Sequence, residues 1–199
     1  MAAIESRRRG RPRSADAEQR IFDAALDLLA EGVGPASISI TEIARRARIG
    51  KDTIYRRWHG KEDLLLEALA SRLTPIEVPD GASLHASLVP SLAALIERMQ
   101  SERERRIACS LRGVGDDFPR LRRLYLGEVV GRRRELVVER VREAASRGEL
   151  RADIDVAGLA QMPFDHVLMR AIDGEPLTGD PLAEAERLIA ALLGGIGAR

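Results

Sequence analysis

Two short helical patterns separated by a three-residue turn, within residues 39–61, constrain the fold of this chain more than any other feature. In the first pattern, apolar residues recur at i, i+3, i+4 and i+7, which predicts one buried helix face made of Ile40, Ile43, Ala44 and Ala47. Ser39 precedes Glu42 by three residues, so a capping box is expected to start this helix. Residues 48–50 break the period and leave room only for a tight crossing.

The second pattern runs from Lys51 to about Trp58 and has an unusual outer face. Ile54 and Trp58 stand at i and i+4 and are expected to face inward, whereas Tyr55 is expected on the outside. Cations and hydrogen-bonding groups occupy the outer positions, where a surface helix normally carries Glu and Lys. A helix of this kind suits the major groove of DNA, where its first residues meet base edges. The two patterns therefore predict a helix-turn-helix.

The run from Thr41 to Leu65 resembles the DNA-binding domain of TetR-family transcriptional regulators, and the resemblance extends over about residues 17–65. The matching positions are Ile43, Ala44, Ala47, Thr53, Tyr55, Trp58 and Lys61 to Leu65. In the C-terminal third, residues 147–151, 162–163 and 174–177 resemble one common type of TetR ligand domain. Gly50 and Gly60 depart from the family, which usually has Ser at the first position and Ser or Asn at the second. The Gly50 difference removes one expected phosphate contact.

The resemblance implies an all-α chain of about nine helices, with an N-terminal three-helix helix-turn-helix domain and a C-terminal helical bundle for ligand binding and dimerisation. We expect a disordered basic arm over 1–13, the helix-turn-helix domain over 14–60, a connecting helix over 61–73, and the effector and dimer domain over 74–199. Apolar periodicity and Gly or Pro positions predict the individual helices, over 15–31, 61–73, 83–101, 102–112, 119–146, 155–173 (kinked at Pro163) and 181–193.

The resemblance also assigns DNA contacts. It places Lys51, Asp52 and Tyr55 at base edges, and it places phosphate contacts at Thr53, Tyr55, Arg56, Arg57 and Lys61. The chemistry agrees in part, because Lys donates to guanine and a carboxylate accepts from cytosine. Asp52 has a second role that stays open, since an acid in the first helical turn is favoured by the helix dipole. Thr41 is a further candidate for a base contact.

The N-terminal residues form a basic patch, with five arginines against Glu5 in residues 1–13. Arg9, Arg11 and Arg13 surround a Gly and a Pro in a pattern like the core of an AT-hook, which lays arginines in a narrow minor groove. The alternative is a basic tail that adds only non-specific phosphate affinity. Residues 41–61 form a second patch, with seven cations against two acids, although the net charge of the chain is only +1. Two local cationic patches indicate a polyanion partner, which is double-stranded DNA.

Composition excludes several other classes. No run of about 18 apolar residues occurs, so we expect no membrane span, and the basic N-terminus lacks the apolar segment of a signal peptide. These observations predict a cytoplasmic protein. The single Cys109 excludes an internal disulfide, and the three histidines are dispersed without metal-ligand spacing, so we expect no metal site. No nucleophile–base pair, carboxylate dyad or phosphate loop stands out, so we expect neither an enzyme nor a cofactor.

The last two helices are the best candidates for a homodimer interface, because each is apolar over a wide arc and two copies form a four-helix bundle. Candidate effector-contacting residues are the Met, aromatic and His side chains of the C-terminal domain, although such residues are more often plain core. The candidates are Met99, Leu111, Phe118, Tyr125, Met162, Phe164, His166 and Met169.

The leading hypothesis is a homodimeric repressor that binds an inverted-repeat operator and leaves it when a small molecule binds the C-terminal domain. Two alternatives stay open. The first is a regulator without a small-molecule effector, controlled by a protein or by its own concentration. The second is an activator. A fully packed C-terminal domain favours the first alternative, whereas operator position decides the second.

Overall fold

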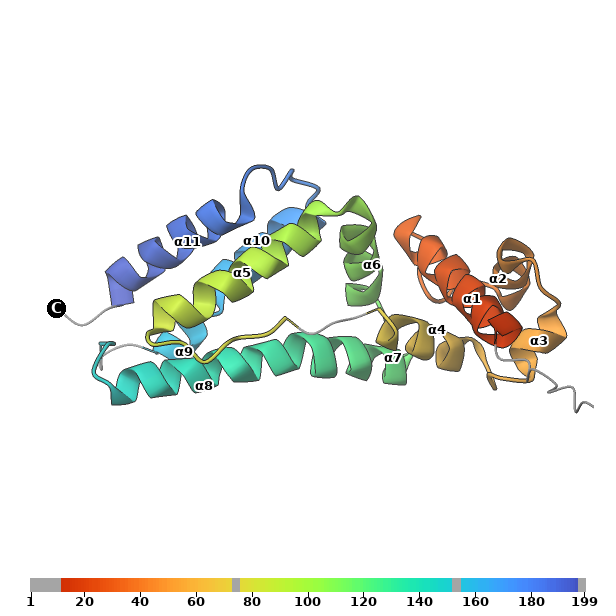
Figure 1. Ribbon diagram of the computed structural model, residues 1–199, viewed down its shortest axis with the longest axis horizontal. Coiled ribbons are helices and arrows are strands. Elements are labelled where there is room, and N and C mark those ends of the chain that lie inside the picture. Colours follow the sequence, from red (N-terminus) through yellow and green to blue (C-terminus); the bar gives the residue numbers. More distant parts are fainter. Residues whose placement is uncertain (1–11, 73–75, 152–154, 197–199) are drawn as a thin grey trace, which may run out of the picture.

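The computed structural model describes residues 12–72, 76–151 and 155–196, and over these ranges the chain is helical with no strand (Figure 1). The predicted all-α class, with an N-terminal helix-turn-helix domain, is confirmed. Residues 1–11, which hold most of the predicted basic arm, lie outside the described residues. None of the helices in the described ranges is long and apolar enough to cross a membrane.

The N-terminal part consists of four helices, α1 (Pro12–Ala30), α2 (Ile40–Ala47), α3 (Lys51–Tyr55) and α4 (Lys61–Ala70). Helix α2 starts where predicted, because the Ser39 side chain accepts a hydrogen bond from the Glu42 amide. Its predicted apolar face is buried at Ile43, Ala44 and Ala47, while Ile40 is half-buried. Helix α1 supports this face from behind, and α4 leads toward the rest of the chain (Figure 1).

Helix α3 is shorter than the predicted span of 51–58. It ends at Tyr55, and the amides of Arg57 and Trp58 both donate to the Ile54 carbonyl in a closing turn. Trp58 is only 3% exposed and packs 5.8 Å from the Phe22 ring, centroid to centroid, with its indole N–H donating to Glu67. The predicted inward Trp58 and outward Tyr55 are therefore both confirmed.

The C-terminal part is a bundle in which α5 lies between α11 and the long rod ending in α8, while α10 packs against both α5 and α8 (Figure 1). Serine caps start α5 and α6 at Ser83 and Ser101, as the predicted boundaries require. The elements are α5 (Leu84–Gln100), α6 (Glu102–Arg112), α7 (Pro119–Arg123), η1 (Leu124–Gly131), α8 (Arg132–Ser146), α9 (Val156–Leu159), α10 (Met162–Ile172) and α11 (Pro181–Ile196).

Two further helix predictions need correction. The rod predicted over 119–146 is continuous, but its middle, η1, is a π-helix, a form that apolar periodicity does not distinguish from an α-helix. The segment 155–173 is not one helix kinked at Pro163. It is two helices, α9 and α10, and Pro163 stands in the first turn of α10, where the missing N–H leaves no intrahelical hydrogen bond unmade.

Candidate DNA-binding surface and effector cavity

The outer face of α3 presents side chains to solvent on a well-anchored backbone. Ile54 is fully buried beneath it, whereas Tyr55 is 58% exposed and Lys51, Asp52 and Arg56 are also exposed. Gly50 occupies the N-cap position in an extended conformation and supplies no side-chain cap, so the first amides of α3 stay available to an outside acceptor. Thr41 is exposed at the start of α2, and Thr53 is half-buried.

Two of the predicted phosphate-binding cations already have partners inside the protein. Arg57 donates to Glu18 at 3.0 Å. The Lys61 ammonium donates to the Ala36 carbonyl at 2.7 Å and lies 5.2 Å from the centre of the Phe118 ring, and partial burial lowers its pKa. Arg9 and Arg11, like the side chain of Arg13, lie outside the described residues.

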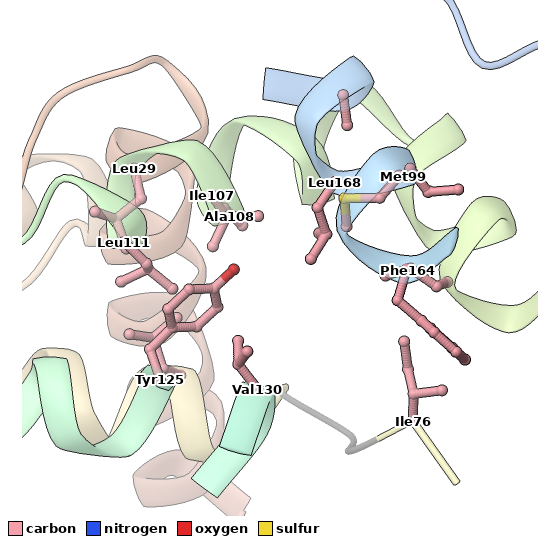
Figure 2. Packing of buried hydrophobic residues seen from close by; sticks show 14 of the residues in the cluster. Leu29, Ile76, Met99, Ile107, Ala108, Leu111, Tyr125, Val130, Phe164 and Leu168 are labelled. Atoms are coloured by element: carbon pink, nitrogen blue, oxygen red, sulfur yellow. The ribbon is translucent and has the colours of Figure 1, made fainter. Parts of the chain in front are cut away.

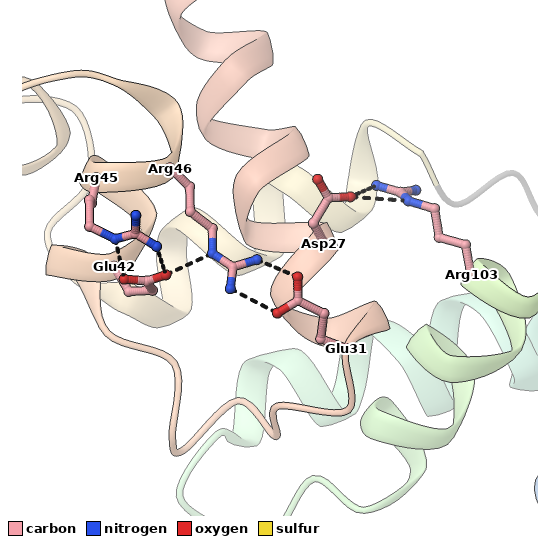
Figure 3. A network of polar contacts seen from close by, with 6 residues as sticks. All are labelled: Asp27, Glu31, Glu42, Arg45, Arg46 and Arg103. Atoms are coloured by element: carbon pink, nitrogen blue, oxygen red, sulfur yellow. Dashed lines mark hydrogen bonds and ion pairs between the residues drawn. The ribbon is translucent and has the colours of Figure 1, made fainter.

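A carboxylate and guanidinium network braces α2 against α1 (Figure 3). The Glu42 carboxylate accepts hydrogen bonds from the side chains of Arg45 and Arg46. The Arg46 guanidinium also donates to the carboxylate of Glu31, the residue that follows α1, at 2.8 Å. Hydrogen bonds from Arg45 and Arg46 lower the pKa of Glu42 to about 2. Of the two hydrogen bonds in the predicted capping box, only the one from the Glu42 amide to the Ser39 side chain forms among the described residues. The Glu42 carboxylate accepts from Arg45 and Arg46 instead.

The turn between α2 and α3 contains a left-handed residue that is not glycine. Arg48 has φ 56° and ψ 50°, and its amide donates to the Arg45 carbonyl. The next amide, that of Ile49, donates to Ala44, which completes a Schellman ending. Ile49 is half-buried and packs against the hydrophobic core.

Helix α4 is fixed to the start of α7 by its first-turn acids. The Arg120 and Leu121 amides donate to Glu62 Oε1 at 2.8 and 3.1 Å, and the Arg120 side chain pairs with Asp63. The first amides of a helix have no intrahelical acceptor, and the Phe118 N-cap supplies no side-chain oxygen to α7. Glu62 therefore caps α7 from the N-terminal domain.

A second junction joins α1 to α6. Arg103 donates to Asp27 at 2.9 Å (Figure 3). The Ser110 hydroxyl donates to the Leu29 carbonyl at 3.0 Å. Of the two helices at these junctions, α6 lines a cavity of the C-terminal domain, and α7 continues into η1, which lines the same cavity.

That cavity lies between α5, α6, η1, α8 and α10 and has a volume of about 50 Å³. It is smaller than the roughly 300–1,000 Å³ typical of ligand pockets. Among the predicted effector contacts, Met99, Leu111 and Tyr125 line it, and the Tyr125 side chain projects between Leu111 and Val130 (Figure 2). The lining is completed by Ile76, Leu95, Arg98, Glu104, Ile107, Ala108, Val129, Val130, Arg133 and Leu168.

The family of the chain follows from comparisons over both domains. The family model of bacterial regulatory proteins of the tetR family matches residues 21–68, and that of tetracyclin repressor-like C-terminal domains matches residues 78–192. The chain belongs to the TetR family. It is therefore a DNA-binding transcriptional regulator and not an enzyme.

Relatives of this TetR-family chain are similar along most of their length. The HTH-type transcriptional regulator YdeS of Bacillus subtilis is 28% identical over 179 residues, which are 89% of this chain and 87% of the relative. The transcriptional regulator AcuR of Cereibacter sphaeroides is 32% identical over 171 residues, 77% of this chain and 76% of its own. Among solved structures, NalD, the secondary repressor of the MexAB-OprM multidrug efflux pump in Pseudomonas aeruginosa, has a TM-score of 0.70. At 22% identity, covering 94% of this chain and 98% of its own, it shows the shared fold.

The remaining predicted effector contacts of this TetR-family chain do not line the cavity. Phe118 lies beneath Lys61, and Phe164 is fully buried in the core beside Arg133. Met162, His166 and Met169 point outward, at i, i+4 and i+7 on one face of α10, with Met162 57% and Met169 47% exposed. Helical spacing alone did not reveal whether this stripe faces its own core or the outside.

The residue that sequence reasoning missed is Arg133, which is only 3% exposed. It interrupts an otherwise apolar seam along the rod that includes Leu121, Tyr125, Val137 and Val141. Following that seam through the sequence would have located an arginine where an aliphatic residue is expected. In the described ranges, no group of three or more His, Cys, Asp or Glu side chains is arranged to hold a metal, and Cys109 is half-buried.

Proposed function

We propose that this TetR-family regulator is a cytoplasmic homodimeric repressor. It binds an inverted-repeat operator through α2 and α3, and it leaves the operator when a small molecule occupies the C-terminal cavity. The observation that carries the gating is the continuous path from the cavity wall to the DNA-binding helices. Tyr125, Val129 and Val130 belong to η1, the same rod that begins at α7 under the Glu62 cap.

DNA recognition rests on the outer face of α3 together with its neighbours. Lys51, Asp52 and Tyr55 are the proposed base contacts, because they are exposed on α3 whereas Ile54 is buried. Thr41, which is exposed at the start of α2, is a further proposed base contact. Thr53 and Arg56 are proposed phosphate contacts. Arg57 and Lys61 serve this role only if they exchange the internal contacts described above. Arg9, Arg11 and Arg13 remain proposed contacts of the N-terminal arm.

The proposed gating uses the two junctions between the domains, α4 with α7 and α1 with α6, because both are connected to the walls of the same cavity. Expansion of a 50 Å³ cavity displaces η1 or α6, whose side chains form its walls. Helix α7 carries such a displacement to Glu62 and Asp63 on α4, while α6 carries it to Asp27 on α1. The effector then acts by binding the non-operator conformation more tightly, which lowers operator affinity by linkage.

The proposed dimer interface uses α10 and α11. Helices α10 and α11 contact each other, and both have exposed residues. On α10 these are Met162, His166 and Met169, and on α11 they include Leu182, which is 52% exposed, Ala183, Ala190 and Gly194. Exposed apolar side chains of this size, repeated along two helices, are typical of protein interfaces. These side chains are therefore proposed to meet a second copy of the chain rather than an effector.

One observation favours the alternative of a regulator without a small-molecule effector. A cavity of about 50 Å³ has room for only a few waters, since one water needs about 10–15 Å³. Effector binding therefore requires the walls to separate. A chain whose walls cannot separate is controlled by a protein partner or by its own concentration.

Selection of bound duplexes from a random DNA pool, followed by fluorescence anisotropy on the selected operator, tests the proposal. A screen of small molecules against the protein–operator complex then measures release. We expect an inverted repeat, one dimer per operator, and release by at least one compound that also protects residues 124–131 from hydrogen exchange. Release without such protection contradicts the proposed path. Operator binding that no compound weakens supports the effector-free alternative.

A further inference from the structure

The guanidinium of Arg133 is buried in the C-terminal domain without the hydrogen bonds that such a group requires. Its side chain is 4% exposed, and neither Nη atom has a hydrogen-bond partner among the described residues. Its nearest acid, Asp165, is 3.8 Å from Nη2, beyond hydrogen-bond range, and both oxygens of Asp165 accept from Arg134 instead. Buried charges are normally paired and hydrogen-bonded, so this arrangement lowers the stability of the fold.

The side chain of Phe164 positions the Arg133 guanidinium but cannot accept a strong hydrogen bond from it. The Phe164 ring stacks against the guanidinium, with Cζ 4.6 Å from the ring centre. Stacking of this kind fixes the plane of the group and leaves its N–H donors free. Burial lowers the pKa of Arg133 to about 10, which still keeps it protonated at neutral pH.

Arg133 is also part of the wall of the cavity, and the polar groups of that wall are few. The other lining residues with polar side chains are Tyr125, Arg98 and Glu104, and the remaining lining is aliphatic or Met. The buried Tyr125 makes no hydrogen bond within the described ranges. Arg98, Arg133 and Glu104 together give the lining of this mostly apolar cavity a net charge of one positive unit.

We infer that the cavity binds a small amphipathic carboxylate, whose charged group pairs with Arg133 and whose apolar part contacts Met99, Ile107 and Leu168. The fork of donors on a guanidinium matches the two oxygens of a carboxylate. The single excess charge favours a monoanion over a phosphate dianion. This inference rests on the proposed function only in naming the occupant an effector, because the site itself stands on the geometry of Arg133.

Binding to the full-length protein tests the inference with straight-chain carboxylates of four to ten carbons, each compared with the primary alcohol of the same length. Isothermal titration calorimetry is expected to find a carboxylate that binds at least tenfold more tightly than its alcohol. Arg133→Met removes this preference and leaves alcohol binding unchanged. Arg132→Met is the matched control, since Arg132 is the exposed neighbour on α8, and it keeps the preference.

The melting temperature of the ligand-free variants gives an independent readout. Arg133→Met is expected to melt higher than the wild type, because a buried cation whose two Nη atoms make no hydrogen bond is replaced by an apolar side chain. A lower melting temperature overturns the inference, since Arg133 is then a satisfied structural residue. If Arg133→Met does not fold, Arg133→Lys replaces it and is expected to weaken carboxylate binding at least fivefold, because lysine lacks the fork.

Different results would contradict the carboxylate site and the proposed release of the operator by an effector. Carboxylates that bind no better than their alcohols, or that do not bind at all, overturn the inference even where a neutral compound releases the operator. Carboxylates that bind through Arg133 without changing operator affinity support the site and contradict ligand-gated repression.

Discussion

The Glu62 cap on α7 allows the link between the two domains to be tested at a single side chain. Glu62→Ala removes the acceptor of the Arg120 and Leu121 amides, at 2.8 and 3.1 Å. Arg120 is an exposed residue, so water can replace the lost acceptor of its amide, whereas Leu121 is fully buried and its amide stays unpaired. Losing a charged hydrogen bond of this kind costs about 2 kcal/mol, which corresponds to a roughly 30-fold change in an equilibrium constant.

Hydrogen exchange measures this loss where it occurs. We expect protection of the Arg120 and Leu121 amides to fall roughly 30-fold in Glu62→Ala. The fall should be smaller in Glu62→Gln, which keeps an acceptor oxygen without the charge. Glu97→Ala is the matched control, because Glu97 is exposed on α5 and makes no contact with another charged group in the described ranges. Protection in Glu62→Ala equal to that in the control would refute the capping role and remove the proposed path through α7.

Three further predictions concern the DNA-binding domain. Tyr55→Ala should lower operator affinity, measured by fluorescence anisotropy, roughly tenfold to a hundredfold. It should shift the unfolding free energy by less than about 0.5 kcal/mol, because Tyr55 is 58% exposed. Unfolding of this variant would instead show that Tyr55 belongs to the core. Arg48→Gly should stabilise the protein to denaturant by about 1 kcal/mol by relieving the left-handed backbone, whereas Arg48→Ala, which keeps the Cβ, should not. Stability from ionised Glu42 should be complete above pH 4.5 and disappear as the pH falls toward 2, because the folded state lowers its pKa from 4.5 to about 2. Denaturant unfolding of Glu42→Gln should therefore converge with the wild type in acid, and a pH-independent difference would contradict this.

Local signals made most of the N-terminal domain predictable from the sequence. Ser39 marks the start of α2 by its side-chain cap, and the spacing of Ile54 and Trp58 decides which face of α3 is buried. These are interactions within a few residues, so the sequence pattern contains them. The internal partners of Arg57 and Lys61 join residues 39 and 25 positions apart, and no local pattern reveals them.

The C-terminal site was only partly predictable, for two physical reasons. An apolar stripe at helical spacing has the same appearance whether it faces the core, as Met99 does, or the outside, as Met162 and Met169 do. The π-helix of η1 depends on backbone hydrogen bonds rather than on side-chain pattern. Arg133 was missed because an arginine on a helix is expected in solvent, whereas this one is buried by the tertiary packing of α8 and α10.

Selection of duplexes from a random pool by the full-length protein tests the central claim most directly. The account predicts that sequencing of the bound fraction reveals an inverted repeat whose enrichment is lost with Tyr55→Ala. Enrichment of no sequence, or of a motif that Tyr55→Ala binds equally well, would contradict recognition through the exposed face of α3.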